Sequence, residues 1–382
     1  MKILLLVPGL PLNLENIKGG VNSATLNLLE GCKIFDINIQ VISFTNEVKN
    51  KITIPFSSKI NIIYIPEGRF NYHALNYLLI VPFKLRNQIK IIKPDLIHFE
   101  VGNSFMLSKL FGIYKTKYLL TIHGMSYDEA KHKIKIKDKI IWYFNGLIQN
   151  IMYPKYIIHL SNFSKKKFDC MKNQIFDIIP NAVPDKYFNI PIKTKTDNNL
   201  LYIGLIDVNK NILHLLKSLK DLISKGYKYT LNIVGDFYSK KYKNIISAYI
   251  YDNDLDNYIH FNGWVSKSEL IPFIQKSDIL VVCSMHESLP MVIAECMSSG
   301  KVVIASDVGG IPEMIKDNET GFLFSLNHEN ELTEKLIMLY DNNITCNKIA
   351  NNARKHGYKY YNTNIVAKKT IDFYKLIIND QY

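Results

Sequence analysis

Residues 279–305 read Ile-Leu-Val-Val-Cys-Ser-Met-His-Glu-Ser-Leu-Pro-Met-Val-Ile-Ala-Glu-Cys-Met-Ser-Ser-Gly-Lys-Val-Val-Ile-Ala. The stretch opens with a short aliphatic run, Ile279–Cys283, and closes with another, Val302–Ala305. Pro290 suits the first turn of a helix over Met291–Ser299. A strand, a helix and a second strand in this order predict two parallel strands joined by a helical crossover.

Similar short runs, rich in β-branched residues, occur along the whole chain, and their brevity suits strands buried on both faces. The first series is Ile3–Val7, Ile39–Phe44, Ile60–Ile65, Leu96–Phe99, Tyr118–Ile122 and Ile157–Leu160, and the second adds Leu200–Ile203, Thr230–Val234 and Ile259–Phe261 to the two runs above. Helical patterns lie between them, as in Ser23–Ile34, Ile212–Lys225 and Leu270–Gln275. Two such series predict an α/β protein with two doubly wound parallel sheets.

The length of the chain, 382 residues, also favours two domains over one core. The polar stretch 192–199 has no apolar periodicity and is the expected joint. We therefore expect an N-terminal domain over 1–195 and a C-terminal domain over 196–364. Residues 365–382 are expected to form a helix that packs back toward the N-terminal domain.

Composition places the protein among globular chains, with 47% hydrophobic and 21% charged residues. The five cysteines contain no C-x-x-C pair and no zinc spacing, so neither a disulfide framework nor a metal site is expected. The apolar run Ile3–Val7 is broken at Pro8, which favours a buried strand over a leader peptide, and no run is long enough to span a bilayer. A cytoplasmic location is expected.

Charge is unevenly distributed. Residues 1–195 hold 27 Lys and Arg against 13 Asp and Glu, whereas residues 196–382 hold 20 against 21. Local basic clusters lie at 131–137 and 165–167. A basic half can meet anionic lipid, a phosphorylated acceptor or nucleic acid, although a solvated lysine-rich face explains it equally well.

Ligands of open α/β sheets bind beyond the carboxyl ends of the strands, so functional residues are expected in the loops there. Gly19-Gly20 precedes a helix and can bring backbone N–H groups to a phosphate, or can simply form a tight turn. His123 follows a strand and can bind a hydroxyl or phosphate, or can be an ordinary surface histidine. Lys210, six residues after Gly204, can neutralise a diphosphate, or can be a surface lysine.

The loop after Ile279–Cys283 carries the largest number of candidate groups. Glu287 lies in the loop and Glu295 one turn into the helix. Free N–H groups of residues 290–292 can hold phosphate, while each carboxylate can accept hydrogen bonds from paired hydroxyls of a sugar or ribose. The alternative is that Glu295 only complements the dipole of its helix.

Glu287 and Glu295 form an E-x7-E pattern, and other motifs accompany it in order along nearly the whole chain. They are Gly19-Gly20, His123-Gly124, Ser161-Asn162-Phe163-Ser164, Ile179-Pro180-Asn181-Ala182-Val183, Gly204 with Lys210, Val234-Gly235-Asp236, Phe261-Asn262-Gly263-Trp264-Val265, Gly309-Gly310-Ile311-Pro312-Glu313 and Thr320-Gly321-Phe322. In this order and spacing the sequence resembles the retaining glycosyltransferases of family 4, which are also called glycosyl transferases group 1. The resemblance implies the GT-B fold, in which two Rossmann-like domains face a central cleft.

The resemblance also implies roles for individual residues. Glu295 would accept hydrogen bonds from the ribose, Glu287 would contact the transferred sugar, and His123 would lie near that sugar. Lys210 would hold the diphosphate with the amides that follow Leu289. The expected catalytic residues are Glu287, His123 and Lys210, and the expected nucleotide-sugar-binding residues are Gly20, Gly204, Lys210, Gly235, Trp264, Val265, Glu287, Leu289, Pro290, Met291, Val292 and Glu295.

We recognise no Asp-x-Asp metal site, so we expect neither metal nor cofactor, with Lys210 and helix-start amides stabilising the charge on the diphosphate. The leaving phosphate is thought to help deprotonate the acceptor in this family. Two positions depart from the family: Leu205 stands where arginine usually follows Gly204, and Asn211 where glycine commonly follows the lysine. One cation is therefore missing from its usual place.

The expected reaction moves a sugar from a nucleotide sugar, with UDP favoured, to a glycan or lipid-linked acceptor of bacterial capsule, lipopolysaccharide or exopolysaccharide. The basic half adds an expected peripheral contact with the anionic inner face of the cytoplasmic membrane. Nucleic acid is not an expected partner, because the aromatics are not interleaved with basic residues. An epimerase of the same fold and a non-catalytic partner of a transferase remain alternatives.

Overall fold

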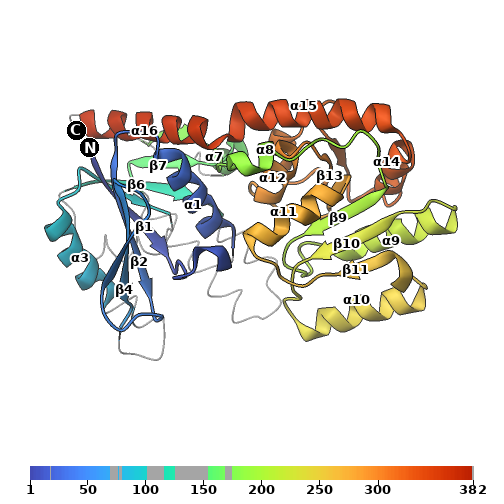
Figure 1. Cartoon of the computed structure of the whole chain (residues 1–382), viewed down its shortest axis with the longest axis horizontal. Helices are drawn as coiled ribbons and strands as arrows, with labels where there is room; N and C mark the ends of the chain where they lie inside the picture. Colours follow the sequence, from blue (N-terminus) through green and yellow to red (C-terminus); the bar gives the residue numbers. More distant parts are fainter. Residues whose placement is uncertain are drawn as a thin grey trace. The chain divides into compact units, whose positions relative to one another are not determined.

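The computed structural model describes residues 1–17, 19–68, 76, 80–100, 116–124, 154–167 and 174–380. The chain folds into two compact units, each with its own parallel sheet (Figure 1). The first unit comprises Met1–Ala182 and Thr363–Tyr382, and the second comprises Val183–Asn362.

The first unit contains an eight-stranded sheet in the order β3-β4-β2-β1-β5-β6-β7-β8. Its strands are β1 (Lys2–Pro8), β2 (Asn38–Thr45), β3 (Ile52–Pro55), β4 (Ile60–Pro66), β5 (Leu96–Phe99), β6 (Lys117–Ile122), β7 (Tyr156–His159) and β8 (Ile175–Ile178). Every neighbouring pair is parallel except β3 and β4. The chain moves outward from β1 to one edge and then returns to add β5 on its other side, so β1 and β5 flank the point where the strand order reverses.

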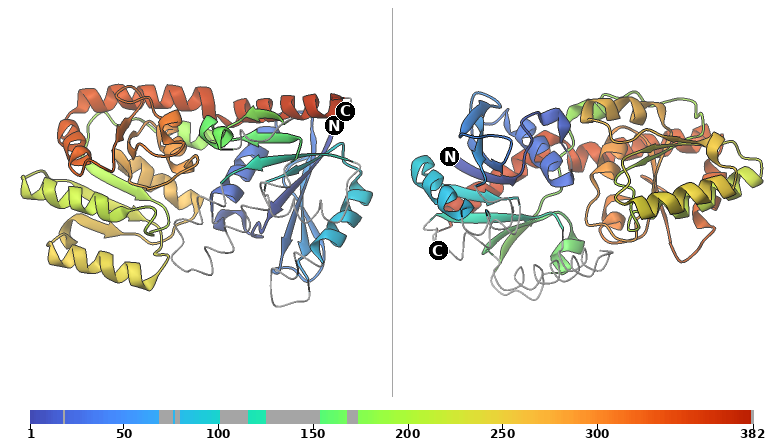
Figure 2. Two further views of the ribbon diagram at one scale, coloured as in Figure 1. Left: turned by 180° about the vertical axis from the view of Figure 1, so that it is seen from behind. Right: turned by 90° about the horizontal axis from the view of Figure 1, so that it is seen from below.

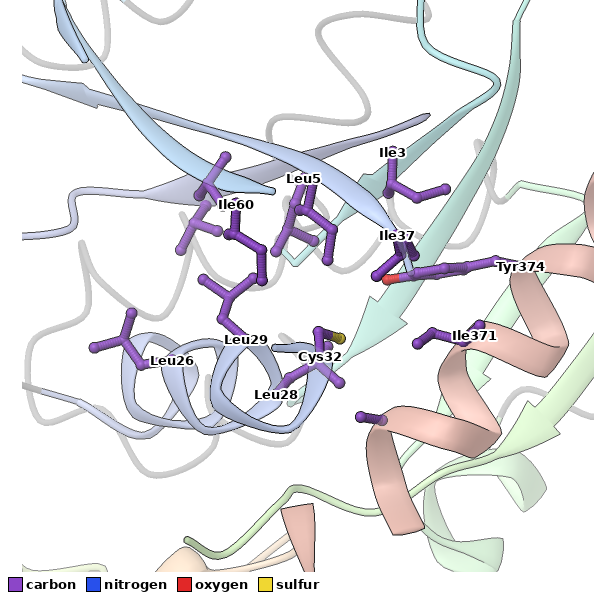
Figure 3. Packing of buried hydrophobic residues seen from close by; sticks show 14 of the residues in the cluster. Ile3, Leu5, Leu26, Leu28, Leu29, Cys32, Ile37, Ile60, Ile371 and Tyr374 are labelled. Atoms are coloured by element: carbon purple, nitrogen blue, oxygen red, sulfur yellow. The ribbon is translucent and has the colours of Figure 1, made fainter. Parts of the chain in front are cut away.

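Helices cover both faces of this sheet. Helices α1 (Gly20–Cys32) and α16 (Thr363–Asn379) pack on the face that receives Ile3 and Leu5, and α3 (Val81–Ile92) packs on the face that receives Leu4 and Leu6. Figure 3 shows side chains of α1 and α16 converging on those of the strands. Alternate residues of β1 thus point into two separate cores, as expected of a strand buried on both faces. The unit also contains the short elements η1 (Leu14–Asn16) and α7 (Asn162–Lys166).

The second unit contains a six-stranded, all-parallel sheet in the order β11-β10-β9-β12-β13-β14 (Figures 1 and 2). Its strands are β9 (Asn199–Ile203), β10 (Thr230–Val234), β11 (Ile259–Phe261), β12 (Ile279–Val282), β13 (Val302–Ser306) and β14 (Phe322–Phe324). Its helices are α8 (Asp185–Phe188), α9 (Ile212–Ser224), α10 (Lys240–Asp252), η2 (Asp256–Tyr258), α11 (Lys267–Lys276), α12 (Met291–Ser298), α13 (Ile311–Met314), α14 (Glu331–Leu339) and α15 (Asn343–Tyr361). The strand order reverses between β9 and β12, which defines the switch point of this unit.

Three strands were not predicted from the sequence, because two are exposed and one is very short. β3 is exposed along its whole length and pairs antiparallel at the sheet edge. β8 is also largely exposed, and β14 has only three residues. Periodicity finds strands through burial, so edge strands and very short strands give it little signal.

The division between the units also differs from the expected boundary at residue 195. Val183, Tyr187 and Ile190 are buried in a core of the second unit, so the chain enters that unit at Val183. The polar stretch 192–199 lies within the second unit and is held there by contacts with Asp278, including an ion pair of 2.7 Å from Lys193. The final helix starts at Thr363, two residues earlier than expected, and belongs to the first unit.

Candidate active site

The switch point of the second unit brings together two of the predicted site residues. Lys210 lies in the loop after β9, and Glu287 lies in the loop after β12, the adjacent strand. Lys210 Nζ is 2.5 Å from Glu287 Oε1, and the Ser284 hydroxyl donates a hydrogen bond of 2.8 Å to the same oxygen. The Lys210 side chain is 30% exposed and that of Glu287 is 12% exposed, so solvent reaches the pair.

The backbone around this pair is held by direct contacts between loops. The Met285 N–H donates to the Asn209 carbonyl at 2.7 Å, and the Asn209 amide donates to the His286 carbonyl at 3.2 Å. The carbonyl of Glu287 accepts from the Gly310 N–H at 3.0 Å. Gly309 has a φ of +60°, and a Cβ there would lie 1.9 Å from the Glu287 carbonyl oxygen, so this close approach requires glycine. Glu287 is thus positioned by the loops after three strands.

Helix α12 begins directly beyond Glu287. Pro290 precedes it with a φ of −68°, and no side chain caps its N-terminus. The first amides of a helix have no partner within the helix and can receive an anion. Leu289 and Val292 anchor this turn by packing against the core, and Met291 is half-buried.

Glu295, one turn further along α12, is not part of the Lys210–Glu287 pair. Its side chain is buried at 5% exposure, and burial raises the pKa of its carboxyl to about 7, although Lys267, Tyr187 and Lys186 oppose the shift. Burial and the nearby carboxylate of Glu295 raise the pKa of the Tyr187 hydroxyl on α8. The structure therefore joins two members of the expected trio and buries the third separately.

The remaining predicted residues of this unit lie beyond the ends of β9, β10 and β11. The Gly204 N–H donates to the Val234 carbonyl at 2.9 Å, and the Gly235 N–H donates to the Gly263 carbonyl at 2.7 Å. A Cβ on Gly235 would lie 1.9 Å from the Gly204 carbonyl oxygen, so glycine lets these strand ends approach. Trp264 is 37% exposed, and Val265 packs against the core.

Leu205 occupies the position where the family usually has arginine. Its side chain is 44% exposed, and its carbonyl accepts a hydrogen bond of 3.0 Å from the Tyr202 hydroxyl. An apolar side chain therefore faces solvent directly after Gly204, where a cation was expected.

In the first unit, Gly20 is the first residue of α1, and His123 follows β6 directly. His123 Nε2 is 2.6 Å from Oε2 of Glu100, a carboxylate that is 3% exposed. Sequence reasoning missed Glu100. The signal was available, because Glu100 follows β5 and β5 pairs with β6, so the rule that selected His123 also applies to it. Both residues line a hollow of about 320 Å³.

Among the described residues no group of three or more His, Cys, Asp or Glu side chains is arranged to hold a metal ion. No helix in the same ranges combines the length and apolar character needed to cross a bilayer. The basic cluster at 131–137 and Cys170 lie outside the described residues, whereas Cys32, Cys283, Cys296 and Cys346 are free and buried.

Comparison with known sequences finds similarity to one family of enzymes. Residues 184–356 match the model of glycosyl transferases group 1. An uncharacterised glycosyltransferase of Methanocaldococcus jannaschii is 27% identical over 355 residues, which is 90% of each chain. An uncharacterised 41.2 kDa protein in the cps region of Klebsiella pneumoniae is 27% identical over 339 residues, which cover 84% of this chain and 87% of that protein.

Comparison with solved structures assigns the fold. Sucrose-phosphate synthase from Thermosynechococcus elongatus aligns with a TM-score of 0.84 at 18% identity over 98% of both chains. HepE from Anabaena, in complex with UDP and glucose, aligns with a TM-score of 0.74 at 16% identity over 97% of this chain and 98% of that one. The family match lies in the second unit, and the fold match covers both. Residues 184–356 therefore match the group 1 glycosyltransferases, and the chain has the GT-B fold.

Proposed function

We propose that this glycosyltransferase is retaining and metal-independent, and that it moves a sugar from a nucleotide diphosphate sugar, with UDP favoured, to a glycan or lipid-linked acceptor of a bacterial cell-surface polysaccharide. The observation that carries the proposal is the ion pair between Lys210 and Glu287 at the switch point of the second unit. The pair lies next to the start of α12, and its lysine remains accessible to solvent.

A partly exposed ion pair contributes little stability, so Lys210 can readily exchange its carboxylate partner for an anion of higher charge. A diphosphate carries more charge than a carboxylate and can also accept hydrogen bonds from the first amides of α12. When the diphosphate binds Lys210, the carboxylate of Glu287 is free to accept hydrogen bonds from hydroxyls of the transferred sugar. Lys210 thus contacts the diphosphate of the donor, and Glu287 contacts its sugar.

In the proposed reaction the bond from the anomeric carbon to the diphosphate oxygen breaks, and negative charge develops on the leaving group. Lys210 and the amides of α12 stabilise that charge. The acceptor hydroxyl forms the new bond on the same face of the sugar and gives its proton to the leaving phosphate, so configuration is retained. This route requires no general base from the protein.

The comparisons support the finer parts of the proposal. HepE from Anabaena was solved with UDP and glucose, which favours a UDP-sugar donor. The Klebsiella relative comes from a cps region, which favours an acceptor in a cell-surface polysaccharide. We assign the ribose to Glu295, the base to the surroundings of Gly235, Trp264 and Val265, and further contacts to Gly20 and His123.

The test begins with thermal shift against UDP-, GDP- and ADP-sugars, because a ligand that binds only the folded state raises its melting temperature. Transfer is then measured with the best donor, with and without EDTA. Equal rates are expected in both, and loss of transfer in EDTA would contradict metal independence. Conversion of the donor to its epimer would indicate the epimerase alternative, and tight nucleotide binding without turnover would indicate a non-catalytic partner.

Two variants test the residue assignments. Glu287→Ala should reduce transfer by about 10²-fold or more while leaving the Kd for the free nucleotide nearly unchanged. Glu295→Ala should raise that Kd by about 10-fold or more, because a charge-assisted hydrogen bond is lost. Wild-type rates in both variants would show that the site is assigned wrongly.

We also infer a cytoplasmic enzyme that contacts the anionic inner face of the membrane through its basic N-terminal half. Of the basic clusters, Lys165–Lys167 lies within the described residues, at the end of α7. Liposome sedimentation tests the contact. Anionic vesicles should bind the protein more strongly than neutral ones, and salt should weaken the binding. Binding that depends on neither lipid charge nor salt would contradict the inference.

A further inference from the structure

A chain of buried polar groups lies beneath His123 in the first unit. His98 on β5 is fully buried, and its Nδ1 is 2.6 Å from the Tyr374 hydroxyl of α16. Its Nε2 is 2.6 Å from the Thr121 hydroxyl of β6 and 3.7 Å from Oε1 of Glu100. The other carboxylate oxygen of Glu100 contacts His123 at 2.6 Å. The cluster therefore extends from the last helix of the chain to the end of β6.

The charges within this cluster follow from burial and from the neighbours. Burial disfavours a charged histidine and lowers the pKa of His98. Burial acts to raise the pKa of Glu100, but its interactions with His98 and His123, including the hydrogen bond from His123, outweigh burial, so its pKa lies below the usual value. An ionised carboxylate has no proton to donate. The hydrogen between Glu100 and His123 must therefore belong to Nε2 of His123.

We propose that Glu100 is a positioning residue that holds the His123 imidazole in its Nε2–H form and leaves Nδ1 as the nitrogen that can accept a hydrogen bond from a substrate hydroxyl. The inference rests on the proposed function, in which His123 lies near the transferred sugar. A histidine ring has two distinct nitrogens, and the partner of one decides what the other can do. Residues that contact the ligand-binding side chains, and not the ligand itself, commonly fix the orientation of those side chains.

The remaining members hold Glu100 in turn. The 3.7 Å between His98 Nε2 and Glu100 Oε1 is too long for a hydrogen bond. Hydrogen bonds to Tyr374 and Thr121 nevertheless fix the orientation of the His98 ring, which packs beside the carboxylate. Tyr374 comes from α16, which gives the C-terminal helix a part in the geometry of the site. The hollow of about 320 Å³ beside these groups is lined by His98, Glu100, Thr121 and His123.

The tautomer of His123 can be measured without any substrate, by NMR of protein labelled with ¹⁵N-histidine. The chain has ten histidines, so the His123 signals are identified by their absence in His123→Asn. We expect Nε2–H in the wild type and in Glu100→Gln, whose amide oxygen can still accept the hydrogen bond. Glu100→Met removes the acceptor while keeping the length of the side chain, and it should lose the preference for Nε2–H.

The kinetic readout is the kcat of transfer, which should fall about 10–100-fold in Glu100→Met and much less in Glu100→Gln, with little change in KM for the donor. The matched control is Glu67→Met, because Glu67 is also buried in the first unit, at 5% exposure, and its carboxylate contacts Asn46 instead of His123. Its tautomer signals and kcat should stay at wild-type values.

Three outcomes overturn the proposal: an Nδ1–H form of His123 in the wild type, an unchanged tautomer in Glu100→Met, or equal loss of kcat in Glu67→Met. The first is measurable even where Glu100→Met fails to fold. A protein that shows the expected tautomers but transfers no sugar would contradict the proposed function and leave the role of Glu100 toward His123 intact.

Discussion

Each unit places a carboxylate beside a nitrogen-containing side chain, a lysine or a histidine, at the carboxyl ends of its parallel strands. The two pairs differ in their access to solvent. Lys210 and Glu287 in the second unit are 30% and 12% exposed, and the lysine reaches its partner on a flexible side chain. His123 and Glu100 in the first unit are 11% and 3% exposed, and they adjoin a buried cluster. In the proposed function the partly exposed pair opens for an anionic ligand, whereas the interior pair keeps one geometry.

The difference follows from the side chains that each unit supplies. Lysine is a mobile point charge that can move from a carboxylate to a phosphate. Histidine is rigid, and a buried partner fixes which nitrogen carries the proton. The second unit is therefore suited to charge compensation, and the first to orientation.

The largest effect is expected from breaking the exposed pair. Lys210→Met keeps the length of the side chain and removes its charge, so transfer should fall about 10²–10³-fold through loss of charge stabilisation on the diphosphate. Steady-state transfer rates measure the effect. The control is Lys217→Met, an exposed lysine of α9, which should keep the wild-type rate. Equal activity of the two variants would show that Lys210 is not the diphosphate cation.

The next effect concerns Glu295, a carboxylate buried in the same unit as the exposed pair. Its pKa is raised to about 7 from 4.5, so the folded state holds a proton that the unfolded chain releases. The contribution of protonated Glu295 to the free energy of unfolding is fully present below pH 4.5 and is lost as the pH rises through about 7. The loss amounts to at most about 3 kcal/mol.

Melting temperatures of the free protein between pH 5 and 8 check this sign. The melting temperature of the wild type should fall with rising pH, and Glu295→Gln should remove that part of the slope and be the more stable protein at about pH 8. Glu334→Gln, an exposed change on α14, should keep the wild-type slope. A slope that survives in Glu295→Gln would mean that another group causes it.

The smallest effect is expected from restoring the arginine that usually follows the glycine at position 204 in this family. Leu205→Arg should raise transfer by about 10-fold at most, which corresponds to about 1.4 kcal/mol in the barrier. The matched control is Val208→Arg in the same loop, because Val208 is 41% exposed and Leu205 is 44% exposed. The gain should appear in kcat at Leu205 only. A similar gain at both positions would indicate general electrostatic attraction of the donor.

Much of the second unit could be predicted because its signals are local. Five of its six strands were predicted from short apolar runs, and the rule that ligands bind beyond strand ends led to Lys210 and Glu287. The burial of Glu295 could not be predicted in the same way. Its position on α12 was clear, but its burial depends on how α12 packs against α8 and α15, which lie far away in the sequence.

In the first unit, more of the structure depends on contacts between residues far apart in the sequence. His123 was found because it directly follows a strand, whereas Glu100 gains its meaning only from the pairing of β5 with β6. The exposed edge strands β3 and β8 lacked the apolar pattern by which strands are recognised. The entry of the chain into the second unit at Val183 is likewise set by burial against helices and strands that come much later in the sequence.

The sequence by itself determined the two parallel-sheet domains, the E-x7-E motif with its lysine, and the loops in which chemistry should be sought, because each depends on neighbours within a few residues. Only the tertiary structure decided that Lys210 contacts Glu287, that Glu295 is buried, and that Glu100 contacts His123. Burial and long-range hydrogen bonds set pKa values and orientation, and both depend on residues that folding alone brings together.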